Sequence, residues 1–239
     1  MTGVRDIWVY LTASPLLHLT MTLAAYQFGH VIYRRMNFNP LCNPVLIAVV
    51  CLVTVFWVSG TSYDSYFAGA QFVHFLLGPA TVALALPLYR HIADVRRSAM
   101  AIGVSLIAGS LTAIGSAVLI AWALGATRNT LVSLAPKSVT APVAMGITEK
   151  LGGLPSLTAV LVIVTGILGA MLGPMVMNAI GVRDWKARGM AMGVASHGIG
   201  TARALQVNQI AGAFSGLAMG LNAVATALLL PLLWRLFAG

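Results

Sequence analysis

Residues 195–205 read ASHGIGTARAL, and this short stretch determines how the rest of the chain has to be built. It sets a histidine, two glycines, two hydroxyl side chains and an arginine between segments of mainly apolar residues. Backbone that leaves helical geometry inside a hydrocarbon layer exposes N–H and C=O groups at a high free-energy cost. Such a stretch is tolerated only where protein or a water-filled cavity surrounds it. We therefore expect a broken helix inside a bundle of membrane helices.

The composition supports a membrane protein along the whole chain. Of the 239 residues, 59% are apolar and only 8% are charged, whereas soluble domains carry about a quarter charged residues. One crossing needs about 20 apolar residues, so the length predicts an all-α polytopic protein with about seven to nine transmembrane segments. We expect one membrane domain over residues 1–239, with a retained N-terminal helix at about 1–36.

The net charge of +9 comes from basic residues in short loops between apolar runs. This is the positive-inside pattern of membrane proteins, and it excludes a nucleic-acid-binding face. The basic loops at 34–35, 90–97 and 183–188 are expected on the cytoplasmic side, with Asp64 opposite. An even number of crossings then separates the last two loops. The polar segment 128–153 either re-enters the membrane or crosses it and turns one basic loop outward, and the sequence leaves both open.

An internal repeat is visible in the chain. Residues 75–104 and 170–194 both read Leu-Gly-Pro, a short apolar stretch, an Asp flanked by basic residues, and a run of small residues. We predict two structural repeats, about 44–124 and 142–237, with discontinuous helices. Repeats with Gly/Pro-interrupted segments are typical of secondary transporters. Chance alignment of apolar sequence is the alternative.

A second polar segment, APKSVTAPVAMGITEK, has features of an anion site. Pro136 and Pro142 disfavour one long helix. Ser138 and Thr140 are suited to cap a helix that begins near Pro142. A helix N-terminus attracts anions, and Lys137 adds a full positive charge beside it.

The first stretch offers complementary groups. Gly198 and Gly200 allow the backbone to turn and approach a ligand, and Thr201 is suited to cap a helix that carries Arg203. An arginine binds a carboxylate with two parallel hydrogen bonds. Together with Lys137, these groups predict a site for a small organic anion near the membrane midplane.

Each of these residues also has an ordinary structural interpretation. Arg203 and Lys137 can extend to a membrane interface, and His197 can be a packed core histidine. Glu149 next to Lys150 can simply end a helix at the surface. The pair Gly198 and Gly200 lacks the context of a dinucleotide motif, and the sequence holds no catalytic triad, CxxC or HExxH pattern. We therefore predict no catalytic residues, no metal, no cofactor and no enzyme activity.

Three segments carry a family resemblance. FLLGPATVALALPLYRH (75–91), LAPKSVTAPVA (134–144) and GVASHGIGTARAL (193–205) resemble the signature segments of the LrgB/CidB family of membrane proteins. The resemblance runs from about residue 40 to the C-terminus and extends to the C-terminal half of the plastidial glycolate/glycerate translocator. The family motifs fall on Lys137, Ser138, Thr140, Pro142, Ser196, His197, Gly198, Gly200, Thr201 and Arg203.

The resemblance implies two functions. One is transport of small monocarboxylates such as pyruvate; the other is holin-like modulation of murein hydrolase activity and autolysis together with a small LrgA/CidA-like membrane partner. Holin-like modulation needs no substrate pocket. An ion channel is a third class, but it calls for a ring of like residues around an oligomer axis, and the sequence offers none.

The anion site and the resemblance together predict a secondary transporter, and the resemblance implies pyruvate, glycolate or similar 2-oxo or 2-hydroxy acids as substrates and the bacterial cytoplasmic (inner) membrane as its location. It would work by alternating access, with an elevator-like motion against a homodimeric scaffold. Lys137 and Arg203 would hold the carboxylate, and His197 or Glu149 would carry a coupling proton. The hydroxyl groups expected to contact the oxo or hydroxy group are those of Ser138, Thr140, Ser196 and Thr201.

Overall fold

The computed structural model describes residues 15–76, 79, 82–83 and 85–238. All regular secondary structure in these residues is helical, which confirms the predicted class. The chain forms two compact units, Met1–Ala83 and Leu84–Gly239, and each is described by itself. The boundary between them falls inside the predicted first repeat, so the division into two repeats stays a prediction.

The first unit consists of α2 (Pro15–Arg35), η1 (Pro40–Cys42), α3 (Pro44–Ser59) and α4 (Tyr63–Phe75). Local sequence signals set both ends of helix α3. Asn43 starts it because its side-chain oxygen accepts hydrogen bonds from the backbone N–H groups of Val45 and Leu46, while Pro44 suits the first turn. Gly60 ends it in the left-handed conformation, with φ of 69°.

Helix α2 packs against both α3 and α4. His18 is buried on α2, with its ring edge-on to Phe56 at 6.2 Å and to Tyr66 at 6.0 Å between centroids. Aromatic contacts of this geometry stabilise the packing beyond the area they bury.

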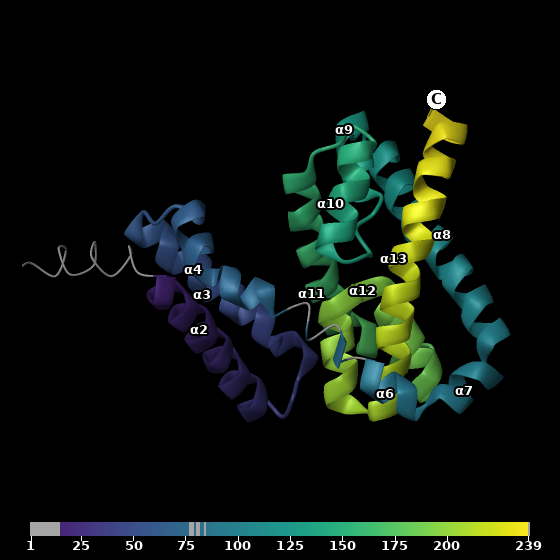
Figure 1. The fold of residues 1–239 in the computed structure, drawn as a ribbon, viewed down its shortest axis with the longest axis horizontal. Coiled ribbons are helices and arrows are strands. Elements are labelled where there is room, and N and C mark those ends of the chain that lie inside the picture. The colour runs from purple at the N-terminus through teal and green to yellow at the C-terminus, as the bar shows by residue number, and fades with distance from the viewer. Residues whose placement is uncertain (1–14, 77–78, 80–81, 84, 239) are drawn as a thin grey trace, which may run out of the picture. The chain divides into compact units, whose positions relative to one another are not determined.

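The second unit contains the two polar segments of interest (Figure 1). Its helices are α6 (Ala85–Arg90), α7 (Ile92–Arg97), α8 (Ala99–Ala123), α9 (Arg128–Leu134), α10 (Ala141–Lys150), α11 (Pro155–Ala179), α12 (Trp185–Val207) and α13 (Gln209–Ala238).

Three helices among the described residues are long and apolar enough to cross a membrane: α8, α11 and the part Gln209–Leu236 of α13. Helices of 25 residues, such as α8 and α11, measure about 37 Å and exceed the roughly 30 Å of a hydrocarbon core. The protein is therefore a membrane protein. The larger count of seven to nine crossings stays a prediction.

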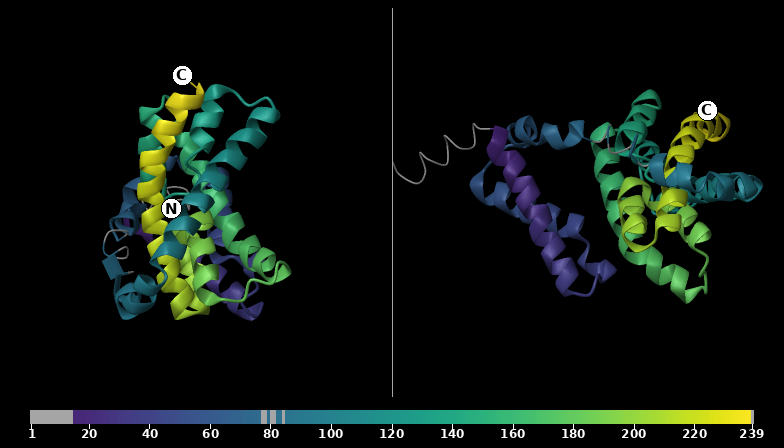
Figure 2. Two further views of the ribbon diagram at one scale, coloured as in Figure 1. Left: turned by 90° about the vertical axis from the view of Figure 1, so that its right-hand side faces the viewer. Right: turned by 60° about the horizontal axis from the view of Figure 1, so that its bottom comes forward.

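Helix α12 packs between α11 and α13, and it lies beside α13 in Figures 1 and 2. Glycines make both contacts close. A side chain at Gly166 of α11 would meet the ring of His197, and a side chain at Gly193 of α12 would meet the backbone of Ser215. Pro174 lies inside an uninterrupted α11, so the second Leu-Gly-Pro sequence does not break its helix. The first one lies largely outside the described residues.

Helices α9 and α10 have seven and ten residues, or about 10 and 15 Å, and are too short to cross a membrane. The hydroxyl of Ser133, near the end of α9, accepts a hydrogen bond from the N–H of Leu154 at 2.8 Å. The start of α11 therefore lies against the end of α9. This geometry is that of the re-entrant alternative, in which residues 128–153 enter and return.

A second contact agrees with this topology. The Nζ of Lys186 lies 2.8 Å from Oδ1 of Asp94, which joins the loop before α8 to the start of α12. Both basic loops therefore lie at the same end of the second unit, as the charge pattern predicts.

Candidate functional site

The turn at residues 135–140 connects the two short helices. Thr140 has extended backbone angles of φ −62° and ψ 145° at the N-cap of α10, and a proline follows in the first turn, as predicted. Its side chain makes no capping hydrogen bond. Ser138 is buried, and its carbonyl accepts a hydrogen bond from the amide of Asn222 at 3.4 Å, so the turn is held against α13.

Three buried hydroxyl side chains hold the helical hairpin, which consists of α9, the turn and α10, in place. Thr158 Oγ1 of α11 lies 3.0 Å from the carbonyl oxygen of Ser133 and 2.9 Å from Oγ1 of Thr148. All three side chains are fully buried. Because buried polar groups are costly when unpaired, this network favours one position of α9 and α10 on α11.

A cavity of about 800 Å³ opens beside the turn. Along α8 it runs from Ser98 to Ala113, and its other walls come from α12, α13 and the turn. Lys137 and Ser138 line it, and the half-buried Lys137 donates a hydrogen bond to the Ser138 hydroxyl at 3.2 Å. The structure therefore brings these two predicted residues together on the wall of one cavity.

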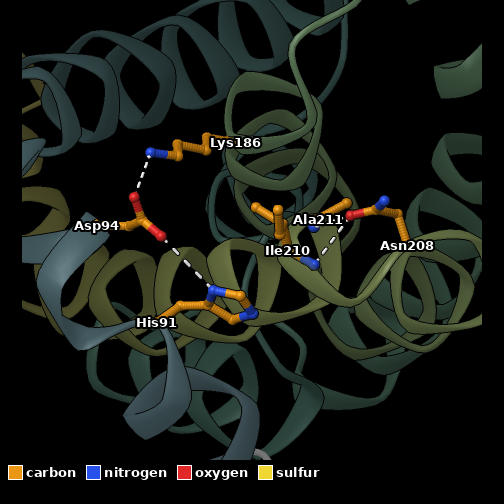
Figure 3. Close-up of polar contacts among 6 residues, drawn as sticks. All are labelled: His91, Asp94, Lys186, Asn208, Ile210 and Ala211. Atoms are coloured by element: carbon orange, nitrogen blue, oxygen red, sulfur yellow. Dashed lines mark hydrogen bonds and ion pairs between the residues drawn. The ribbon is translucent and has the colours of Figure 1, made fainter.

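Charged groups lie at the loop end of the same cavity, which is the end beside the basic segments 90–97 and 183–188. Asp184 and Lys186 line it there, and Lys186 is paired with Asp94 (Figure 3). His91 Nδ1 lies 3.6 Å from the second oxygen of Asp94, and the Lys186 Nζ lies 5.8 Å from the centroid of the buried Phe214 ring.

The hydrogen bond and positive charge of Lys186 hold the pKa of Asp94 below its usual range. The Asp94 carboxylate therefore stays ionised at neutral pH, and the ion pair is lost only as the pH falls through this lowered pKa. Sequence reasoning did not assign this group a role. The indication of Asp94 in the sequence was the pattern of an aspartate flanked by basic residues in both proposed repeats.

The break in α12 lies at His197, with φ of 40° and ψ of −131°. We expected the turn at Gly198 and Gly200; the histidine takes the non-helical conformation instead. Its Nε2 lies 2.9 Å from the carbonyl oxygen of Val162, and the ring is buried. This hydrogen bond to α11 holds the conformation that a non-glycine residue rarely adopts.

The residues around the kink are packed. Thr201 donates to the carbonyl of His197 at 2.8 Å and pairs with the hydroxyl of Ser215 at 2.9 Å. It lies inside α12 and does not cap a new helix as the sequence suggested, because the helix continues through it. Ser196 is fully buried against Gly169 and Gly200, whereas Gly198 is exposed.

The remaining candidates lie apart from the cavity. Arg203 is half-buried on α12 and Glu149 is exposed in the last turn of α10, and neither lines the cavity with Lys137. Ala195 is the residue of the first stretch that does line it. The structure thus assembles Lys137 and Ser138 in the cavity and does not bring Arg203 or His197 to them there.

The residues that line the cavity offer the ammonium groups of Lys137 and Lys186, hydroxyl groups and the carboxylate of Asp184. In the described part of the chain no group of three or more His, Cys, Asp or Glu residues is placed to hold a metal ion.

Comparison of the sequence with known proteins identifies relatives along most of the chain. The model of the LrgB-like family matches residues 22–236. The Holin-like protein CidB of Staphylococcus epidermidis is 35% identical over 221 residues, which cover 92% of this chain and 96% of that protein. CidB of Staphylococcus aureus is 33% identical over 93% and 96%, and YwbG of Bacillus subtilis is 35% identical over 91% and 96%. No solved structure matches.

Proposed function

This chain belongs to the LrgB-like family, and from that premise we propose that it is a holin-like membrane protein that modulates murein hydrolase activity and autolysis. The observation that carries the proposal is the similarity to proteins named holin-like CidB over more than nine-tenths of both chains. We place it in the bacterial cytoplasmic membrane as a multi-pass protein, because three apolar helices and basic loops at one end of the second unit support that topology.

The proposal includes association within the membrane. A homodimer, or a complex with a small LrgA/CidA-like partner, would pack helix against helix through small residues. Neither function that we consider is an enzymatic reaction.

The test is complementation. The chain is expressed in a Staphylococcus epidermidis strain that lacks its own CidB, and detergent-triggered autolysis and murein hydrolase zymograms are recorded. We expect the rate of autolysis to return toward that of the parent strain. An unchanged rate, with the chain present in the membrane fraction, contradicts the proposal. The variant Lys137→Gln serves as a comparison, because a role that needs no pocket survives this change.

A second candidate is transport of small monocarboxylates such as pyruvate or glycolate. The observation in its favour is the cavity, where the half-buried Lys137 and the Ser138 hydroxyl face a space of about 800 Å³ between α8 and α12. A carboxylate binds well to an ammonium group supported by hydroxyl donors. The two short helices and the kinked α12 belong to the kind of discontinuous structure that surrounds substrates in transporters.

Alternating access in this candidate requires the cavity to open first to one side and then to the other. An elevator-like motion and proton coupling are part of the candidate. Glu149 and His197 remain its proposed proton carriers.

Uptake of labelled pyruvate and glycolate into proteoliposomes, with and without a proton gradient, tests this candidate. We expect saturable uptake that is lost in Lys137→Gln and kept in Lys150→Gln, a matched change at an exposed lysine of α10. Arg203→Gln then decides whether the arginine belongs to the path. Absence of uptake by folded wild-type protein, across several monocarboxylates, leaves only the holin-like function.

A further inference from the structure

The cavity beside the turn is elongated and has a charged group toward each end. Its α8 wall extends from Ser98 to Ala113, a distance of about 22 Å along the helix. Lys186 lies toward the Ser98 end, because its partner Asp94 precedes that residue by one turn. Lys137 lies toward the other end, because the adjacent Ser138 shares a small pocket with Ala113.

The two lysines lie toward opposite ends of the cavity. Hydroxyl-bearing residues line the α8 wall of the cavity from one end to the other. The side chains that provide these hydroxyls are Ser98, Ser105 and Thr112. An anion inside would therefore contact the lysines one after the other.

The outer lysine already holds a carboxylate. Lys186 is paired with Asp94 at 2.8 Å, and the two side chains are 36% and 38% exposed. Ion pairs in contact with water exchange readily with other ions, because solvent weakens the attraction. A carboxylate that arrives from the loop side can replace Asp94 with the same chemistry.

We propose that the Asp94–Lys186 ion pair is a latch at the loop end of the cavity, and that a small organic carboxylate opens it by replacing Asp94 on Lys186 before it moves to Lys137. Lys186 is then an outer station and Lys137 an inner station of one anion path. The proposal rests on the second candidate function for the nature of its ligand. It concerns access to the cavity and not movement across the membrane.

Phe214 supports the assignment of Lys186 to the outer end of the anion path. Its ring is buried, lines the cavity and lies 5.8 Å from the Lys186 Nζ, within the range of a cation–π contact. Asp94 on one side and the ring on the other fix the lysine at the loop end of the cavity.

The test measures access with a cysteine in the cavity. Thr112→Cys is made in a chain in which the free cysteines Cys42 and Cys51 are replaced by serine. Inside-out membrane vesicles, which present the basic loops to the medium, are treated with a negatively charged methanethiosulfonate reagent. In this background we expect Asp94→Asn to raise the labelling rate by about threefold.

A double exchange, Asp94→Lys with Lys186→Asp, restores the pair with reversed positions and is expected to return the rate toward that of the unmodified pair. Asp64→Asn is the matched control, since it makes the same change on an exposed residue of the first unit. An unchanged rate in Asp94→Asn overturns the latch. Labelling of Ser98→Cys without any labelling of Thr112→Cys overturns the inner station.

Pyruvate at millimolar concentration is the ligand probe. It is expected to slow labelling of Thr112→Cys more than sodium chloride at equal ionic strength, because pyruvate that has passed the open ion pair and bound Lys137 excludes the reagent from the neighbouring cysteine. Equal protection by chloride overturns the assignment to carboxylates. Because labelling requires neither transport nor lysis, a failure of uptake or of complementation leaves this result interpretable by itself.

Discussion

The turn at residues 135–140 and the kink at His197 are both breaks in helical structure, but their surroundings differ. Both combine polar side chains with residues that weaken a helix. The turn presents Lys137 to a cavity, whereas the kink places an imidazole and a hydroxyl between closely packed helices. A polar break in a membrane helix therefore has two uses: it can expose a charge to water, or it can bend a helix around a close contact.

The largest expected effect concerns the close contact. Gly166→Ala would place a methyl group 2.6 Å from the His197 ring, and such overpacking destabilises by about 3 kcal/mol. We expect a marked fall in the melting temperature, followed by tryptophan fluorescence in detergent.

Gly103→Ala is the matched control, because no atom lies within 4 Å of the methyl position on α8. There the loss of backbone freedom in the unfolded chain favours a gain of about 0.5–1 kcal/mol. Equal melting temperatures for the two variants would show that the contact between α11 and α12 is loose.

The second effect concerns the backbone of the kink. At φ of 40° and ψ of −131°, glycine fits better than alanine, and the strain amounts to about 1–3 kcal/mol. His197→Gly and His197→Ala both lose the hydrogen bond to Val162, so their difference in stability reports the strain less the roughly 0.5–1 kcal/mol that glycine loses through the greater freedom of its unfolded chain. We expect the glycine variant to melt at the higher temperature. The reverse order would mean that the helix straightens when the imidazole is removed.

The third effect tests how the turn is held. Thr158→Val removes the hydroxyl that contacts Ser133 and Thr148 while keeping the shape of the side chain. An unpaired buried polar group costs about 1–3 kcal/mol, so we expect faster proteolysis at the hairpin and a lower melting temperature. Thr54→Val is the control, since that exposed hydroxyl bonds only its own helix. If both variants behave alike, the network does not position the hairpin.

The smallest effect separates the two basic residues. Lys137→Gln is expected to reduce the preference of Thr112→Cys for an anionic over a cationic thiol reagent by about fivefold, because one nearby positive charge is lost. Arg203→Gln is expected to change this ratio by less than about twofold, since the arginine does not line the cavity. A larger effect at Arg203 would bring the kink into the anion path.

Sequence patterns predicted the long helices because their determinants are local. Asn43, Pro44 and Gly60 start and end α3, and uninterrupted apolar runs form α8 and α11. The helical class and the membrane setting follow from the same patterns. The number of crossings and the repeats depend on how helices associate, and they stay predictions.

The site was predictable only in part. The position of Lys137 beside Ser138 and a helix N-terminus could be recognised from its prolines and hydroxyls. The break within residues 195–205 was also predicted and is confirmed. Its position at His197 could not be predicted, because it depends on Val162 and on glycines of α11 that lie more than 25 residues away in sequence. The partnership of Asp94 with Lys186 joins residues 92 positions apart, and only the folded chain reveals it.

That separation has a consequence for biogenesis. Asp94 is synthesised and inserted long before Lys186. Their ion pair can therefore form only after α8, α9, α10 and α11 have been inserted. If residues 128–153 were threaded across the bilayer, Lys186 would emerge on the opposite side and the pair could not form. The contact at 2.8 Å thus forms only if residues 128–153 return to the side of the membrane from which they entered, and only after α11 has been synthesised.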